Sequence, residues 1–224
     1  ANATGIIVKD TLNEVVFTNT RGTVPLRLQK LDQDGKPLSG AVFRLQNADG
    51  DTINVVRKDD GSYAAITSAA DVIDTDQLYY IAAARDPDYV VGQNTSLLTL
   101  DAQLQKKTGA DTQKVRVYRQ KDGSYSFQSV KNNNWLDLHE AGLTNGTLIH
   151  FWENPDTPTT HDNQKWYLSV NKDGTFKIKP RVAVLKESNL VMDLNGGSIG
   201  EGEKIQGWED NSSPAQKWLL VPVD

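Results

Sequence analysis

The chain alternates hydrophobic and polar residues over short runs, which is the pattern of half-buried β-strands. No apolar stretch keeps a period of 3.6 residues for three turns. Clear runs occur at 15–19, 24–31, 41–45 and 53–56, and Asp-Gly turns follow several of them, as at Asp34-Gly35 and Asp60-Gly61. The pattern therefore predicts an all-β chain built from antiparallel hairpins.

The C-terminal part carries an internal repeat. Asn-Gln-Lys-Trp at 163–166 and Ala-Gln-Lys-Trp at 215–218 place their glutamines 52 residues apart, and a weaker copy at 112–115 precedes the first by 51. Aromatic residues follow the same period, since Tyr125 and Phe176 lie 51 residues apart and Tyr79 lies 46 before Tyr125. This spacing predicts three similar units, beginning near residues 77, 123 and 174.

Units two and three share a further landmark. Asp137 precedes Trp152 by 15 residues, and Asp193 precedes Trp208 by the same number. Together with the Gln-x-Trp segments, these motifs resemble ricin-type β-trefoil lectins over residues 77–224. The resemblance implies a β-trefoil in which Gln164, Trp166, Gln216 and Trp218 are chiefly structural.

The same resemblance implies where a sugar would bind. In this family an Asp accepts hydrogen bonds from two hydroxyls, an aromatic side chain stacks on the pyranose, and polar residues near Gln-x-Trp complete the site. Both residue types suit the task, because a carboxylate makes charge-assisted hydrogen bonds and a flat ring covers the C–H face of a sugar. The candidate carbohydrate-binding residues are Asp137, His150, Trp152, Asn163 and Gln164 in unit two, and Asp193, Gln206, Trp208 and Gln216 in unit three.

The units are not expected to be equal. Unit three has Ala215 where unit two has Asn163, which predicts a weaker site. Unit one has Val91 at the expected Asp position and Val115 in place of the Trp, so we expect no sugar there. The alternative for units two and three is that each Asp caps a turn and each Trp is buried.

The N-terminal part resembles a different family. Residues 28–32 and 35–45 are similar to the opening of SpaA/CnaB-like modules of Gram-positive surface adhesins, which implies a prealbumin-like β-sandwich over residues 1–76. Members of that family join a lysine to an asparagine as an isopeptide, and Lys30 and Asn19 match those residues. The family's acid would fall near Ala83, where the chain has no carboxylate, so a solvent-reaching Lys30 is the alternative.

Composition removes several classes of function. The net charge of −5 argues against nucleic acid, whose phosphates require a basic face, and no apolar run could span a membrane. The chain has no cysteine, which excludes disulfides and thiolate metal sites. The three histidines, His139, His150 and His161, lie 11 residues apart each time and are expected to be ordinary surface residues. No cofactor or metal site is predicted.

Catalysis is not expected either, because the chain has no serine nucleophile elbow, phosphate loop or His-Glu-x-x-His motif. The chain opens at Ala1 without a signal-peptide pattern, so any export signal is expected to have been removed or to lie upstream. The resemblance to Gram-positive surface modules implies an extracellular, secreted or cell-wall-associated protein.

We therefore expect a non-catalytic part of a bacterial adhesin or pilin-like protein. Its partners would be glycans, galactose-type first, on host or neighbouring cells, and it would be a monomer within a larger multi-module protein. The alternatives are a structural or protein-interaction spacer and the carbohydrate-binding module of a secreted glycosidase.

Overall fold

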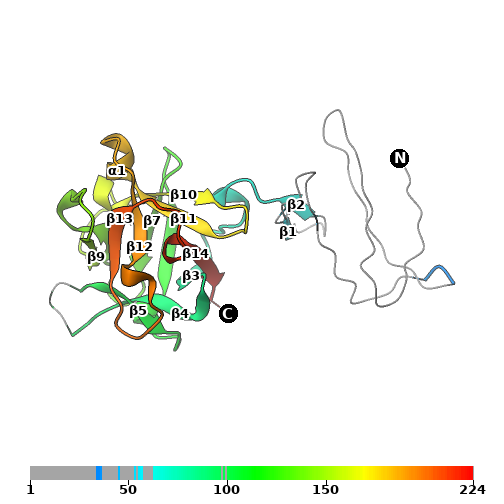
Figure 1. Cartoon of the computed structure of the whole chain (residues 1–224), viewed down its shortest axis with the longest axis horizontal. Coiled ribbons are helices and arrows are strands. Elements are labelled where there is room, and N and C mark those ends of the chain that lie inside the picture. The colour runs from blue at the N-terminus through cyan, green and yellow to red at the C-terminus, as the bar shows by residue number, and fades with distance from the viewer. Residues whose placement is uncertain are drawn as a thin grey trace. The chain divides into compact units, whose positions relative to one another are not determined.

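The computed structural model describes residues 34–36, 45, 53, 55–57, 63–96, 98 and 100–223 (Figure 1). The chain divides into two compact regions, Ala1–Phe43 and Arg44–Asp224. In the first region the described residues form a turn in which Gly35 has φ +78°, as predicted for the Asp-Gly pair. The predicted division into residues 1–76 and 77–224 stays a prediction.

A hairpin lies in the N-terminal part of the second compact region, Arg44–Asp224. Strands β1 (Val55–Arg57) and β2 (Tyr63–Ala65) pair antiparallel with Arg57 opposite Tyr63, which agrees with the hairpin predicted around Asp60-Gly61. The Ile53 N–H also donates to the Leu45 carbonyl at 2.8 Å. The rest of the predicted β-sandwich, including Asn19 and Lys30, lies outside the described residues.

The repeated region folds into three lobes of four strands each. Lobe one contains β3 (Leu78–Ala83), β4 (Asp86–Gln93), β5 (Ala102–Lys106) and β6 (Val115–Arg119). Lobe two contains β7 (Tyr125–Ser129), β8 (Trp135–Leu138), β9 (Thr147–Trp152) and β10 (Trp166–Val170). Lobe three contains β11 (Phe176–Pro180), β12 (Leu190–Leu194), β13 (Ile205–Glu209) and β14 (Trp218–Pro222).

Helical structure is sparse in the described part of the chain. The α-helix α1 (Arg181–Leu185) follows β11 directly. Short 3-10 turns occupy Ala69–Asp71, Asp111–Gln113, His139–Ala141, Asp162–Gln164, Asn195–Gly197 and Pro214–Gln216. None of the helices described is long and apolar enough to cross a membrane.

The outer strands of the three lobes close into a barrel. Going round the ring, β3 pairs with β6, β6 with β7, β7 with β10, β10 with β11, β11 with β14, and β14 again with β3. The two inner strands of each lobe form a hairpin, namely β4–β5, β8–β9 and β12–β13. A six-stranded barrel with one hairpin per lobe is the β-trefoil architecture, and the closed ring leaves the barrel without an open sheet edge.

The predicted landmarks lie in one shared core. The first strand of each lobe contributes an aromatic ring, Tyr79, Tyr125 or Phe176, and these are only 2%, 3% and 4% exposed. The tryptophans that open β10 and β14, Trp166 and Trp218, are fully buried in the same core. The repeat in the sequence is therefore the repeat of core positions.

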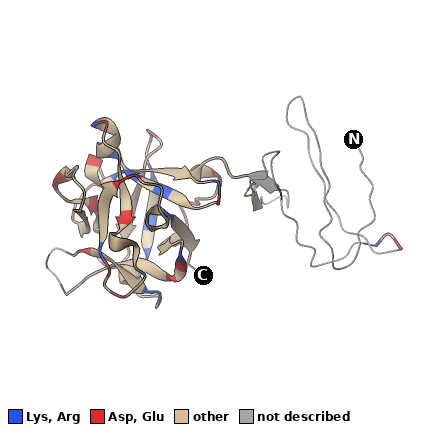
Figure 2. Ribbon diagram, viewed as in Figure 1, with Lys and Arg blue, Asp and Glu red and all other residues tan. Residues whose placement is uncertain are grey.

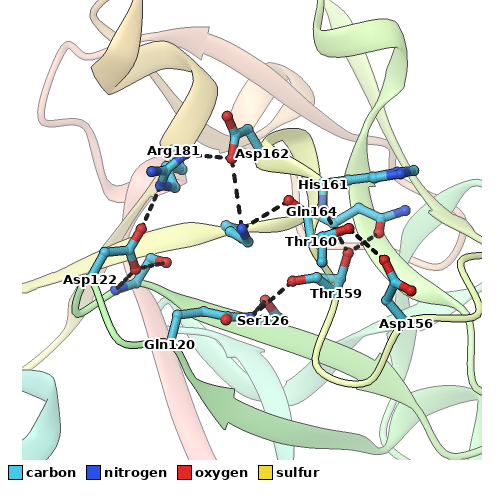
Figure 3. A network of polar contacts seen from close by, with 12 residues as sticks. Gln120, Asp122, Ser126, Asp156, Thr159, Thr160, His161, Asp162, Gln164 and Arg181 are labelled. Atoms are coloured by element: carbon cyan, nitrogen blue, oxygen red, sulfur yellow. Dashed lines mark hydrogen bonds and ion pairs between the residues drawn. The ribbon is translucent and has the colours of Figure 1, made fainter.

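A salt-bridge network joins two lobes (Figure 3). The Arg181 guanidinium of α1 donates from Nε to Asp122 Oδ2 at 2.6 Å and from Nη1 to Asp162 Oδ1. Asp122 lies in the turn between β6 and β7, where Ser124 donates to it from both its amide and its hydroxyl. Burial alone would raise the pKa of Asp122, but the hydrogen bonds from Ser124 and the charge of Arg181 hold it below its usual value.

We expect Arg181→Ala to lower the free energy of unfolding by about 1 kcal/mol at neutral pH, the upper range for an exposed ion pair. A carboxyl group with a depressed folded-state pKa stabilises the fold above its unfolded value of 3.8, and this contribution disappears as pH falls through the folded value. The loss should therefore shrink as the pH falls below 3.8. Urea unfolding of Arg181→Ala and of the exposed control Lys186→Ala measures it, and a constant loss at all pH values would contradict the assignment.

Candidate functional site

Two buried indoles fix the backbone beside the predicted site residues. Trp166 Nε1 donates to the Leu136 carbonyl at 3.1 Å, and Trp218 Nε1 donates to the Met192 carbonyl at 3.1 Å. Leu136 directly precedes Asp137, and Met192 directly precedes Asp193. Each Gln-x-Trp segment thus anchors the strand that presents the carboxylate of its own lobe.

In lobe two, four of the predicted residues form one continuous cluster. Asp137 lies opposite His150 in the β8–β9 hairpin, and His150 Nε2 is 3.0 Å from Asp137 Oδ1. Asn163 Nδ2 donates to the other carboxylate oxygen at 3.0 Å. The His150 ring stacks on Trp152 with centroids 5.3 Å apart and planes inclined by 19°. The cluster therefore runs from Asn163 through the acid and the imidazole to the indole.

Burial differs sharply along this cluster. Asp137 and His150 are only 2% and 3% exposed, whereas Trp152 is 47% exposed. The expectation that all three histidines are ordinary surface residues is therefore wrong for His150, which fills the space between the acid and the indole. His139 approaches the His150 ring edge-on with centroids 5.0 Å apart, while His161 is exposed.

Lobe three repeats the arrangement with different chemistry. Asp193 lies opposite Gln206 in the β12–β13 hairpin, and Gln206 Nε2 donates to Asp193 Oδ1 at 3.0 Å. Burial raises the pKa of Asp193, although the side-chain amides of Gln206 and Gln216 act in the opposite direction. Trp208 is 37% exposed. These groups line a depression of about 610 Å³, together with residues that include Arg85, Asn211, Ser213 and Ala215.

The glutamines of the two Gln-x-Trp segments are enclosed in the protein. Gln164 is completely buried, and its Oε1 accepts from Thr159 Oγ1 at 2.6 Å and from Asn154 Nδ2 at 3.1 Å. Gln216 Oε1 accepts from the amides of Asn211 and Ser212, and its Nε2 donates to the Glu209 carbonyl at 2.9 Å. These contacts brace the loop before each Trp, so we leave both glutamines out of the surface that a ligand could touch.

The strand register corrects the predicted alignment of lobe one. The pairs Trp135↔Trp152 and Val191↔Trp208 correspond to Val90↔Gln105. The position of the Asp is therefore Gly92, and Val91 is a buried core residue. A β-carbon on Gly92 would lie 2.1 Å from Gln105 Oε1, so the glutamine at the Trp position occupies the space that an Asp would need. Lobe one thus lacks both groups of the candidate site.

Charge and metal-ligand patterns in the described region add no further candidate site to those of lobes two and three. In the view of Figure 2, basic and acidic residues are interspersed along the ribbon of the trefoil. Among the described residues, no group of three or more His, Asp or Glu side chains could hold a metal ion.

The sequence did not reveal Arg85 as a candidate site residue. Arg85 belongs to lobe one but lines the lobe-three depression, and no local motif connects positions so far apart in the sequence.

Comparison with known families now adds to this geometry. The family model of the ricin-type β-trefoil lectin domain-like proteins matches residues 111–185 and 162–224, which together span 111–224. The chain belongs to this family. No curated relative matches the sequence. Ricin-type lectin domains bind carbohydrates and are typically non-catalytic, which supports a carbohydrate-binding role for this one.

Solved structures establish the same fold. A designed threefold-symmetric protein, ThreeFoil, is 20% identical with a TM-score of 0.58 and aligns over 67% of this chain and 100% of its own. The ricin B-like lectin of Macrolepiota procera, solved with lactose, is 14% identical with a TM-score of 0.55, over 66% and 97%. An exo-β-1,3-galactanase from Clostridium thermocellum is 20% identical with a TM-score of 0.54, over 77% of this chain but only 38% of the galactanase.

We expect Trp166→Phe to cost about 2–3 kcal/mol of unfolding free energy, because it leaves a small cavity and removes the donor to the Leu136 carbonyl. The matched control is Trp152→Phe, since this indole is 47% exposed and the change should stay within roughly 0.5 kcal/mol. Denaturant unfolding followed by circular dichroism measures both. Equal losses in the two variants would show that the buried indole does not anchor the hairpin.

Proposed function

We propose that this chain is the non-catalytic, glycan-binding part of a larger extracellular protein, with binding sites on the inner hairpins of lobes two and three. The observation that supports it is that each hairpin carries a carboxylate on one strand and, two register positions away on the neighbouring strand, a partly exposed indole. The indoles are 47% and 37% exposed, so neither Trp152 nor Trp208 is sealed in the interior. Buried indoles would have favoured a purely structural trefoil.

Each site would divide the work between its two groups. The carboxylate would accept hydrogen bonds from adjacent sugar hydroxyls, and the indole would cover the apolar C–H face of the ring. In lobe two, His150 and Asn163 orient Asp137, and the stacked imidazole holds the plane of Trp152. In lobe three, Gln206 orients Asp193 at the edge of the depression.

The two lobes would differ in how the carboxylate is reached. Asp137 is enclosed by a histidine and an asparagine, whereas Asp193 has side-chain amides as its partners and lines an open depression. The geometry therefore favours lobe three at least as much as lobe two, although the missing asparagine had predicted the opposite order. A shallow single site binds weakly, so two sites on one chain would strengthen attachment to a surface that displays many glycans.

Galactose-type sugars are the first candidates. The Macrolepiota procera lectin was solved with lactose, which contains galactose, and the Clostridium thermocellum enzyme is a galactanase. The galactanase likeness also favours a second function, because there the trefoil is one part of a longer glycosidase. A catalytic domain encoded in the same gene would support that alternative over an adhesin.

For the wider context we propose a surface adhesin or pilin-like protein of a Gram-positive bacterium, acting as a monomer outside the cell. The resemblance of residues 28–45 to SpaA/CnaB-like modules supports this, and the β1–β2 hairpin agrees with a strand-rich N-terminal module. Intact mass tests the proposed link between Lys30 and Asn19, because the bond would release one ammonia. Localisation of the full-length protein by surface labelling tests the rest.

We expect Asp193→Ala and Trp208→Ala each to weaken glycan binding by lobe three about tenfold or more, since a charge-assisted hydrogen bond or a stacked ring contributes roughly 1.5 kcal/mol. Asp137→Ala and Trp152→Ala should do the same for lobe two. A glycan array followed by calorimetry on the best ligand measures these losses. Gln105→Ala in lobe one is the control and should leave binding unchanged. Unaltered binding in all four site variants, or no binding by the parent, would favour the structural spacer.

A further inference from the structure

An arginine from lobe one lies in the depression of lobe three. Arg85 follows β3 at the turn into β4, and its side chain is exposed. Its Nη1 donates to the carbonyl oxygen of Gly197, which is 112 residues away in the sequence. Arg85 lines the same depression as Asp193 and Trp208, so a ligand held by those two groups would also meet a guanidinium.

The room for this guanidinium comes from small residues. A β-carbon built on Gly197 would lie 3.5 Å from Arg85 Nη1 and 3.6 Å from the Ala215 side chain. Ala215 is the lobe-three counterpart of Asn163, whose amide donates to Asp137 in lobe two. Lobe three has therefore lost the neutral donor at this position and has gained a cationic donor next to it.

Among the described residues, no carboxylate neutralises the charge of Arg85. In the part of the chain that the structure describes, Arg85 forms no ion pair with a carboxylate, unlike Arg181, Lys177 and Lys217. A guanidinium has five N–H donors in a planar fork, and the Gly197 carbonyl accepts from only one nitrogen. The remaining donors are suited to the planar, two-oxygen geometry of an anionic group.

We propose that the lobe-three depression binds an anionic saccharide, a pyranoside bearing a carboxylate or a sulfate, and that Arg85 pairs with this group. The proposal rests on the proposed glycan-binding function and specifies the class of ligand. Asp193 and Trp208 hold the hydroxyls and the C–H face of the sugar, while Arg85 selects for the charged substituent. The Asp193 carboxylate does not prevent this, because Gln206 donates to one of its oxygens and the carboxylate would accept hydrogen bonds from the sugar hydroxyls.

Electrostatics outside the depression make Arg85 the decisive group. The whole chain has a net charge of −5, which disfavours an anionic ligand at long range. A preference for acidic sugars must therefore come from a local cation, and Arg85 is a cation that lines the depression. Because the ion pair between Arg85 and the anionic sugar would be partly solvated, the preference for anionic over neutral sugars should weaken as ionic strength rises.

Three methyl glycosides that differ at one position test the proposal: the β-galactoside, the β-galacturonide and the 6-sulfo-β-galactoside. The Trp152→Ala chain is used as the parent so that calorimetry or ligand-observed NMR reports on lobe three. We expect at least one anionic glycoside to bind more tightly than the neutral one. Arg85→Gln should weaken that binding about tenfold, and the neutral glycoside by less than about twofold. Arg85→Lys should fall between them, since it keeps the charge but not the fork.

Arg119→Gln is the matched control, because it removes the same charge from a residue that does not line the depression. A preference for the galacturonide alone identifies a carboxylate as the substituent, and a preference for the sulfated sugar alone identifies a sulfate. Equal binding of neutral and anionic glycosides, or an unchanged preference in Arg85→Gln, overturns the proposal and leaves glycan binding intact. Failure to bind any glycoside, with thermal unfolding showing a folded chain, overturns both.

Discussion

The bond from each buried indole to a strand carbonyl is the contact on which the outer surface of this trefoil depends. Trp166 and Trp218 are fully buried, and each donates its single N–H to the residue that precedes an aspartate. The indole N–H is a hydrogen-bond donor, and a buried donor needs an acceptor, which the strand carbonyl supplies. The requirement fixes the height and direction of the second strand in its lobe. The core and the candidate site are thus two sides of one strand.

The three lobes show how one register accommodates three different surfaces. At two equivalent positions of the inner hairpin, lobe two has Asp137 and Trp152, lobe three has Asp193 and Trp208, and lobe one has Gly92 and Gln105. The backbone pairing is the same in each, because it is set by core residues that alternate with these positions. Side chains on the outer face are therefore free to vary without disturbing the barrel.

Much of this organisation was predictable from the sequence, and the exceptions have physical causes. The 15-residue spacing of Asp and Trp predicted which residues share a hairpin in lobes two and three, because the same spacing gives both hairpins the same register. The predicted Asp position of lobe one was wrong by one residue, because this lobe has no aromatic residue to mark its third strand. The burial of His150 was missed because a single histidine in an alternating strand does not reveal its surroundings. Arg85 could not be found at all, because its contact joins residues 112 positions apart. The predicted N-terminal sandwich lies mostly outside the described residues.

Because Arg85 of lobe one lines the depression of lobe three, ligand preference depends on residues of two repeats and not of one. The acid and the indole belong to the last repeat, but the guanidinium beside them belongs to the first, and only closure of the barrel brings these ends of the trefoil together. A substitution in the first repeat can therefore retune recognition while the last repeat stays unchanged. A symmetric protein assembled from copies of the third repeat alone would inherit its acid and its aromatic ring but not its neighbour's charge.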